Sequence, residues 1–429
     1  MNVIKYPKRD EWGALLERPH RDASELREVV SKVIDKVRKE GDEAVKAFEE
    51  QFDKVRLCSL AVSEAEMAEA EGLVSAELME ALRLAHANIE KFHASQKFEC
   101  AKVETACGVV CWQKSVAIEK VGLYVPAGTA PLFSTVLMLA TPAKIAGCKE
   151  IVLCTPPNQE GKVHPAILMA AKVAGVSRIF KVGGVQAVAA MAYGTESVPK
   201  VSKIFGPGNQ FVMAAKQQVS LHEVAIDMPA GPSEVAVVAD DTANPVFVAA
   251  DLLSQAEHGI DSQVILITTS EAMAAQVDAE VSRQLVLLPR KEMAEQALKH
   301  SKLIIVKDID EAIEMTNEYA PEHLILAVEH YHEVAEKVIN AGSVFLGNYS
   351  CESAGDYASG TNHTLPTSGY AKAYSGVNLD SFCRKITFQE LSAEGIRSIG
   401  RAVELMAEAE QLDAHKNAMT VRLLSEECK

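Results

Sequence analysis

A glutamine and a histidine three positions apart are the first residues whose types and spacing suggest chemistry. Gln255 and His258 fall in the last turn of a predicted helix that starts after Asn244 and ends before Gly259. Residues three apart share one face of a helix, so an amide oxygen and an imidazole could both reach a metal ion. The histidine could instead simply interact with the negative end of the helix dipole. The spacing also differs from the HExxH pattern of zinc proteases.

An adjacent carboxylate and imidazole, Glu322 and His323, form the second candidate. Pro321 ends a predicted helix, and the pair opens a buried strand. The two groups have different reference pKa values, so together they can serve as general acid and general base. A strand cap beside a hydrogen-bonded core histidine is the structural alternative. Ligand clefts of open α/β sheets lie at carboxyl ends of strands, whereas this pair stands at an amino end.

Two further groups lie near the C-terminus. Asp356 and His363 belong to a long predicted loop, residues 351–369, and long loops are often functional. Glu410 and His415 lie in a helical tail, where a lone histidine is usually only solvated. Neither group points to one chemistry by itself.

The glycine-containing turns do not match the usual nucleotide fingerprints. The chain contains neither GxGxxG nor GxxxxGK[ST]. It has YVPAGTAPLFST at 124–135 and FGPGNQF at 205–211, both at predicted strand-to-helix junctions. Either turn could admit a phosphate to a helix N-terminus, although ordinary tight turns would look the same.

The elements that must position these residues follow from the hydrophobic pattern. Short apolar runs alternate with amphipathic helical windows from about residue 117, first to about residue 210 and again from 234 to 348. Buried strands that alternate with helices indicate parallel βαβ units. The sequence therefore predicts an α/β fold with two lobes of similar design, preceded by a helical segment and followed by a helical tail.

Composition limits the function classes. The chain has 429 residues, 48% of them hydrophobic, with 43 Lys and Arg against 59 Asp and Glu, a net charge of -16. This balance argues against nucleic acid and anionic membranes as partners. No apolar stretch reaches the roughly 20 residues that a membrane-spanning helix needs. Nine scattered cysteines without a CxxC pair, and a polar N-terminus, favour a reducing cytoplasm.

Seven motifs taken together resemble the histidinol dehydrogenase family. They occur in the expected order and cover nearly the whole chain from about residue 25: VGLYVPAGTAPLFSTVLMLATPA, KIFGPGNQFV, DMPAGPSE, DLLSQAEHGIDSQV, EYAPEHL, GDYASGTNHTLPT and AHKNAM. The resemblance implies two incomplete Rossmann-like lobes with parallel sheets, a homodimer and one zinc per active site. It also implies a reaction in which L-histidinol, two NAD and water give L-histidine.

The resemblance further implies a role for individual residues. The implied zinc ligands are Gln255, His258, Asp356 and His415, the last reaching the site of the partner subunit. The implied acid/base pair is Glu322 and His323. The implied substrate contacts are Ser233, Gln255, His258, Glu322, His323, Asp356, His363, Glu410 and His415. The implied NAD contacts are Tyr124, Gln186 and Asn209.

Five segments are expected on this basis. They are an N-terminal arm (1–24), a helical segment that packs with the second lobe (25–116), a first Rossmann-like lobe on the NAD side (117–230), a second Rossmann-like lobe with the zinc and acid/base residues (231–375), and a C-terminal helical tail exchanged between subunits (376–429). Two other functions stay open: a thiol-dependent aldehyde dehydrogenase that uses Cys351 or Cys154, and a two-lobe small-molecule binding protein.

Overall fold

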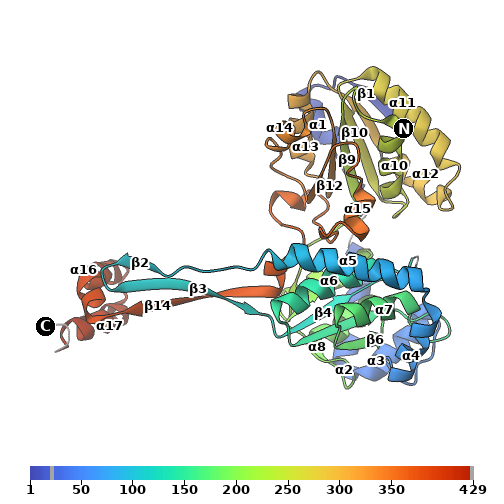
Figure 1. Cartoon of the computed structure of the whole chain (residues 1–429). Helices are drawn as coiled ribbons and strands as arrows, with labels where there is room; N and C mark the ends of the chain where they lie inside the picture. The colour runs from blue at the N-terminus through green and yellow to red at the C-terminus, as the bar shows by residue number, and fades with distance from the viewer. Residues whose placement is uncertain (20–23, 129, 426–429) are drawn as a thin grey trace.

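Two α/β lobes and a long projecting arm make up the chain in the computed structural model (Figure 1). The structure describes residues 1–19, 24–128 and 130–425. Each lobe contains its own parallel sheet, and the arm contains a small antiparallel sheet. The predicted α/β class with two parallel-sheet lobes is confirmed. No helix in the described ranges is long and apolar enough to cross a membrane.

The first lobe is built on a five-stranded parallel sheet in the order β6-β5-β4-β7-β8. Its strands are β4 (Lys120–Tyr124), β5 (Glu150–Thr155), β6 (Arg178–Lys181), β7 (Lys203–Phe205) and β8 (Ala225–Ile226). The helices between them are α6 (Phe133–Ala146), α7 (Pro165–Ala174), α8 (Gly184–Tyr193) and α9 (Gln210–Ser220). The strands are buried on both faces, which explains their continuous apolar runs.

The helices that precede this lobe pack against it. They are α2 (Ser24–Glu40), α3 (Asp42–Phe48), a π-helical turn (Glu49–Asp53), α4 (Glu64–Leu73) and α5 (Ala76–Ala94). Helix α2 contacts α8 and α9, α4 contacts α7, and α5 contacts α6 and α7. The expectation that residues 25–116 pack with the second lobe is therefore wrong. Their apolar stripes, such as Val30, Val37 and Ile89, complete the two layers that cover the first sheet.

The second lobe is built on a six-stranded parallel sheet in the order β1-β11-β10-β9-β12-β13. Its strands are β1 (Asn2–Lys5), β9 (Glu234–Ala239), β10 (Gln263–Thr268), β11 (Lys302–Ile305), β12 (His323–Ala327) and β13 (Ser343–Leu346). Its helices are α10 (Pro245–Ala256), α11 (Glu271–Leu285), α12 (Lys291–Leu298), α13 (Ile309–Tyr319), α14 (Tyr331–Ala335) and α15 (Glu352–Tyr357).

The N-terminal residues do not form a separate arm. Strand β1 is the edge strand of the second sheet and pairs in parallel with β11 from Asn2 opposite Lys302 onward, and the short helix α1 (Trp12–Leu15) follows it. Trp12 is buried in the core of this lobe. The prediction failed because a four-residue strand at a sheet edge, largely exposed, is too short to show a period of two.

The projecting arm consists of β2 (Val103–Ala106), β3 (Val109–Ala117) and β14 (Cys383–Leu391), followed by α16 (Ala393–Ala409) and α17 (Asp413–Leu423). Strands β3 and β14 pair in antiparallel register and run away from the first lobe, with both helices at the far end (Figure 1). The segment 376–429 is thus not wholly helical, and residues 103–117 are strand. Cross-strand pairs such as the stacked rings of Trp112 and Phe388 stabilise this exposed ribbon.

Candidate active site and metal centre

Two elements of the second lobe, β12 and α10, bring predicted site residues together at the amino edge of its sheet. His323 is the first residue of β12, and Gln255 lies in the last turn of α10. A helix that connects parallel strands runs opposite to them, so its C-terminus returns to the amino edge. This arrangement explains how an acid/base pair at the start of a strand can meet a candidate metal ligand at the end of a helix.

Glu322 is held by two hydrogen bonds. Its Oε2 atom accepts from the backbone N–H of Glu234 (3.0 Å) and from Nε2 of Gln255 (3.3 Å). Gln255 Oε1 then remains buried without a hydrogen-bond partner among the described residues. The hydrogen bond to Glu322 therefore fixes the orientation of the Gln255 amide and leaves its oxygen available as a metal ligand.

His323 lies between two carboxylates. Its Nδ1 is 3.7 Å from Glu322 Oε2, and its Nε2 is 3.4 Å from Asp356 Oδ1. Burial by itself would lower the pKa of His323, but Glu352, Glu322 and Asp356 together raise it well above the usual value. Burial would raise the pKa of Asp356, but other effects, of which the contact with His323 is the largest, lower it below its usual value. The surrounding carboxylates thus stabilise an imidazolium once His323 has accepted a proton.

A group of side chains that could hold a metal ion lies beside this pair. The ligand atoms of His258, Glu352 and Asp356 all lie within 4.8 Å of one another. Asp356 Oδ1 and Glu352 Oε2, like Gln255 Oε1, are buried and have no hydrogen-bond partner in the described part of the chain. Buried polar atoms are normally satisfied, and a set of oxygens with one imidazole suits a divalent metal. The residues present fit a metal centre.

His363 connects this site to the first lobe. Its Nδ1 donates to the backbone oxygen of Asp356 (2.8 Å), and its Nε2 pairs with Thr135 Oγ1 (3.0 Å) on α6 of the first lobe. Burial lowers the pKa of His363. The segment 351–369 is not all loop, because α15 carries Asp356 within it. Ser233, half-buried, directly precedes β9.

Glu410 and His415 do not join these residues within one chain. Glu410 is the C-cap residue that follows α16, and His415 is exposed on α17, at the far end of the arm (Figure 1). The second lobe stands apart from that end of the arm.

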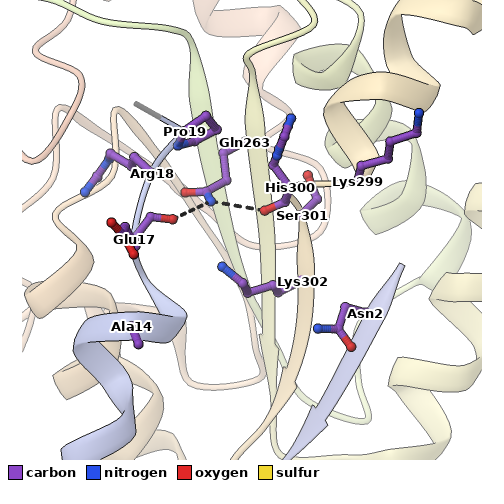
Figure 2. Close-up of a pocket in the computed structure, with 10 residues that line it drawn as sticks. All are labelled: Asn2, Ala14, Glu17, Arg18, Pro19, Gln263, Lys299, His300, Ser301 and Lys302. Atoms are coloured by element: carbon purple, nitrogen blue, oxygen red, sulfur yellow. Dashed lines mark hydrogen bonds between the residues drawn. The ribbon is translucent and has the colours of Figure 1, made fainter. Parts of the chain in front are cut away.

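A network of buried polar groups surrounds the carboxylate of Glu234, the residue whose backbone N–H donates to Glu322. The Glu234 carboxylate accepts from Arg18 Nε (2.5 Å) and Nη2 (3.0 Å) and from the Tyr319 hydroxyl (3.1 Å). This network borders a cavity of about 290 Å³, in which Gln263 Nε2 donates to the backbone oxygens of Glu17 and His300 (Figure 2). The predicted site residues lie outside the cavity lining, so the cavity is separate from the acid/base pair.

The predicted NAD contacts lie at the carboxyl edge of the first sheet. The strand order reverses between β4 and β7, and ligands of open α/β sheets bind at such a switch point. Tyr124 ends β4, and its hydroxyl accepts from the Gly184 N–H at the start of α8 (3.2 Å). Asn209 follows β7 and caps α9 through its Oδ1. Two of the three residues thus flank the switch point.

Gln186 is held by a glutamate that the sequence reasoning missed. Its Nε2 donates to Oε1 of the fully buried Glu49 (2.8 Å), which also accepts from the Gly183 N–H (3.0 Å). Burial raises the pKa of Glu49 to about 7. Glu49 occupies the N-terminus of α8, where a phosphate would otherwise be favoured. No pattern near Glu49 distinguishes it from the other acidic residues of its helix.

A buried ion pair holds the glycine-containing turn at residues 205–211 in place. Lys216 Nζ donates to Asp227 Oδ1 (2.5 Å) and to the Gly206 backbone oxygen (2.7 Å), and Asp227 Oδ2 accepts from the Gly206 N–H (2.8 Å). Gly206 has a φ of 121°, and a Cβ there would lie 2.0 Å from the Tyr124 backbone oxygen. The turn therefore packs directly against the end of β4, and the ion pair between Lys216 and Asp227 holds it there.

Replacing Lys216 with methionine is expected to lower the free energy of unfolding of the first lobe by about 3–5 kcal/mol, because Asp227 would be left as an unpaired buried charge. Urea denaturation measures the change. The matched control is Lys200→Met, which breaks a more exposed pair with Glu223 and should cost less than about 1 kcal/mol. Equal losses in the two variants would contradict a structural role for the buried pair.

Known proteins match the whole chain. A family model described as histidinol dehydrogenase matches residues 16–423. A histidinol dehydrogenase of Bacteroides thetaiotaomicron is 68% identical over 423 residues, 99% of each chain, and one of Escherichia coli K12 is 54% identical over 412 residues, 95% of this chain and 94% of the relative. A crystal structure of histidinol dehydrogenase from Elizabethkingia anophelis superposes with a TM-score of 0.97 at 55% identity, covering 99% of this chain and 98% of that one. The chain therefore belongs to the histidinol dehydrogenase family.

Proposed function

We propose that the chain oxidises L-histidinol to L-histidine in two successive steps through a bound aldehyde, with NAD and zinc. The observation that carries the proposal is the buried Glu322–His323 pair beside a set of metal-type ligands, in a chain that matches histidinol dehydrogenases over its full length. The two alternatives from the sequence are not favoured. Cys154, for example, is fully buried, and burial raises its pKa far from that of a reactive thiolate.

His323 would act as the base in both steps. In the first step it takes the proton of the substrate hydroxyl while a hydride leaves the carbon that bears this hydroxyl. The nearby carboxylates of Glu322 and Asp356 stabilise the resulting imidazolium. In the second step Glu322 takes a proton from the water that adds to the aldehyde, and His323 takes the hydroxyl proton of the hydrate as the second hydride leaves.

The metal and the cofactor supply the rest of the chemistry. When bound, zinc provides a fixed Lewis-acid contact that orients the substrate, and NAD provides an acceptor for each hydride. Gln255, His258 and Asp356 would hold the metal together with the partner subunit's His415. Tyr124, Gln186 and Asn209 would hold NAD; substrate contacts would include Ser233, His363 and Glu410, with the carboxylate of Glu410 suited to the substrate amine.

We also propose that the protein works as a homodimer in which each arm reaches the other subunit. The far end of the arm exposes large apolar side chains, which include Leu405, Met406 and Leu424. Exposed apolar patches of this kind mark interaction sites. A reducing cytoplasm is the compartment that the free cysteines favour.

The purified protein is expected to contain about one zinc per chain and to release about two NADH for each histidinol consumed. Metal analysis and absorbance at the NADH band measure both quantities in one preparation. The second NADH distinguishes a four-electron enzyme from an ordinary alcohol dehydrogenase. A ratio near one would refute the proposed two-step reaction, and a protein active without any metal would refute the role of zinc.

A further inference from the structure

Glu49 is a fully buried carboxylate in the first lobe to which the proposed mechanism gives no role. It begins the π-helical turn Glu49–Asp53, and its Oε1 accepts from the Gly183 N–H (3.0 Å) and from Nε2 of Gln186 (2.8 Å). Turns of this kind are rare and frequently occur at functional sites. We propose that Glu49 is a positioning residue for the cofactor: it orients the amide of Gln186 so that the amide oxygen faces a hydrogen-bond donor of NAD, such as a ribose hydroxyl.

The orientation of the Gln186 amide follows from its contact with Glu49. The oxygen of Glu49 accepts a hydrogen bond, so the amide nitrogen of Gln186 must face it and the amide oxygen must face the other way. Gln186 Oε1 is buried and has no hydrogen-bond partner among the described residues. Buried acceptors are normally paired, so this oxygen is placed for a donor that arrives with a ligand. Because the atom is covered, the side chains around it must shift slightly when that donor binds.

The surroundings of this oxygen place it where NAD is proposed to bind. A Cβ at Gly184 would lie 3.0 Å from Gln186 Oε1, and the Gly184 N–H donates to the Tyr124 hydroxyl (3.2 Å). Gly184 therefore lies close to polar atoms of two proposed NAD contacts. Tyr124 ends β4, beside the point where the strand order reverses and where ligands of open α/β sheets bind.

The second lobe contains the same arrangement. Gln255 Nε2 donates to Glu322 Oε2 (3.3 Å), and Gln255 Oε1 is likewise buried without a hydrogen-bond partner in the described part of the chain. In both lobes a buried glutamate binds the amide nitrogen of a glutamine and leaves the oxygen for a ligand. Without the glutamate, the amide could turn over and present its nitrogen instead.

Glu49 can orient Gln186 in its uncharged form. Burial raises the pKa of Glu49 to about 7 and also raises the pKa of the neighbouring Asp53. Glu49 Oε2 has no hydrogen-bond donor within the described ranges, and one proton shared with Asp53 would satisfy it while Oε1 continues to accept. Glutamine at position 49 reproduces this protonated state, because its oxygen accepts and its nitrogen can donate to Asp53. Glu49→Gln is therefore the conservative variant, whereas Glu49→Leu removes the acceptor.

The inference rests on the proposed function, because it assumes that the protein uses NAD. Glu49→Leu is expected to raise the KM for NAD about 5- to 10-fold, the effect of one lost hydrogen bond, and to keep kcat at saturating NAD within about twofold. The Kd of NADH, followed by NADH fluorescence without turnover, should rise by the same factor. Glu49→Gln should keep both constants within about twofold of wild type. Equal weakening of NADH binding in Glu49→Gln and Glu49→Leu would contradict positioning through the accepting oxygen.

A second substitution, Gln186→Leu, separates positioning from packing. If Glu49 acts through Gln186, then Glu49→Leu should raise the KM no further in a chain that already carries Gln186→Leu. The double variant replaces both side-chain partners with apolar groups, so it should fold even if Glu49→Leu alone does not. A further rise in KM in the double variant, or NADH binding by Glu49→Leu as tight as that of wild type, would overturn the inference. Wild-type protein that neither binds NADH nor forms it from histidinol would instead refute the proposed function.

Discussion

Replacing His323 with asparagine is expected to lower kcat by about 100- to 10,000-fold for both the alcohol and the aldehyde substrate. His323 is buried, and its two ring nitrogens face Glu322 and Asp356 at 3.7 and 3.4 Å. Asparagine keeps a polar group of smaller size but cannot accept a proton near neutral pH. Because His323 is assigned as the base of both oxidations, both rates should fall. Steady-state kinetics with histidinol and with histidinaldehyde measure the two effects separately.

Glu322→Gln is the paired control for this prediction. The amide oxygen of glutamine can still accept the hydrogen bond from the Glu234 N–H, so the local structure should persist. Glu322 is assigned to activate water and is only one of the two carboxylates beside His323, so aldehyde oxidation should collapse while alcohol oxidation continues at a reduced rate. The opposite pattern, in which aldehyde oxidation survives and alcohol oxidation is lost, would show that the roles of Glu322 and His323 are assigned wrongly.

Mixing two inactive variants is expected to restore activity if the active site is shared between subunits. Gln255→Ala and His415→Ala should each remove a metal ligand and lose nearly all activity. In a hybrid dimer one site would carry both defects and the other would be intact. Random reassociation makes half of the dimers hybrid, so the mixture should recover about a quarter of the wild-type activity. Joint refolding of the two variants followed by an NADH assay measures the recovery.

A second mixture shows whether recovery depends on the arm. Gln255 and Asp356 both lie in the second lobe of one chain, close to His323. A mixture of Gln255→Ala with Asp356→Ala should therefore leave every site defective and stay inactive. Recovery in this control, or the absence of recovery when Gln255→Ala and His415→Ala form hybrid dimers, would contradict a site completed by the partner.

The regular part of the fold could be predicted because its signals are local. Strands β5 and β10, for instance, are buried along their whole length and read as continuous apolar runs between helical windows. Strands β1 and β14 were missed because they are held by pairing with strands that lie far away in the sequence. Strand β1 is a short edge strand, and β14 is largely exposed and held by pairing with β3. Pairing over such distances leaves no period in the sequence.

The candidate site was predictable only in part. Helical spacing predicted that Gln255 and His258 share the last turn of one helix, but α10 ends at Ala256 and His258 lies just past it. The adjacency of Glu322 and His323 was plain. The approach of the two pairs to each other comes from the return of α10 to the amino edge of the sheet, which no spacing encodes. Glu352 carried a signal that was overlooked, since it precedes Asp356 by four residues, one turn of a helix. The segment was interpreted as a loop, in which that spacing has no meaning.

The position of β1 has a consequence for the order in which the chain acquires its structure during synthesis. Strand β1 belongs to the second lobe but leaves the ribosome about 300 residues before its partner strand β11. All five strands of the first sheet emerge in between, so most of the first lobe can form before β11 is made, whereas Val377 and Phe382 of its core follow later. Strand β1 must therefore wait unpaired until β11 has been made, and the closing of the second sheet is a late, long-range event in folding.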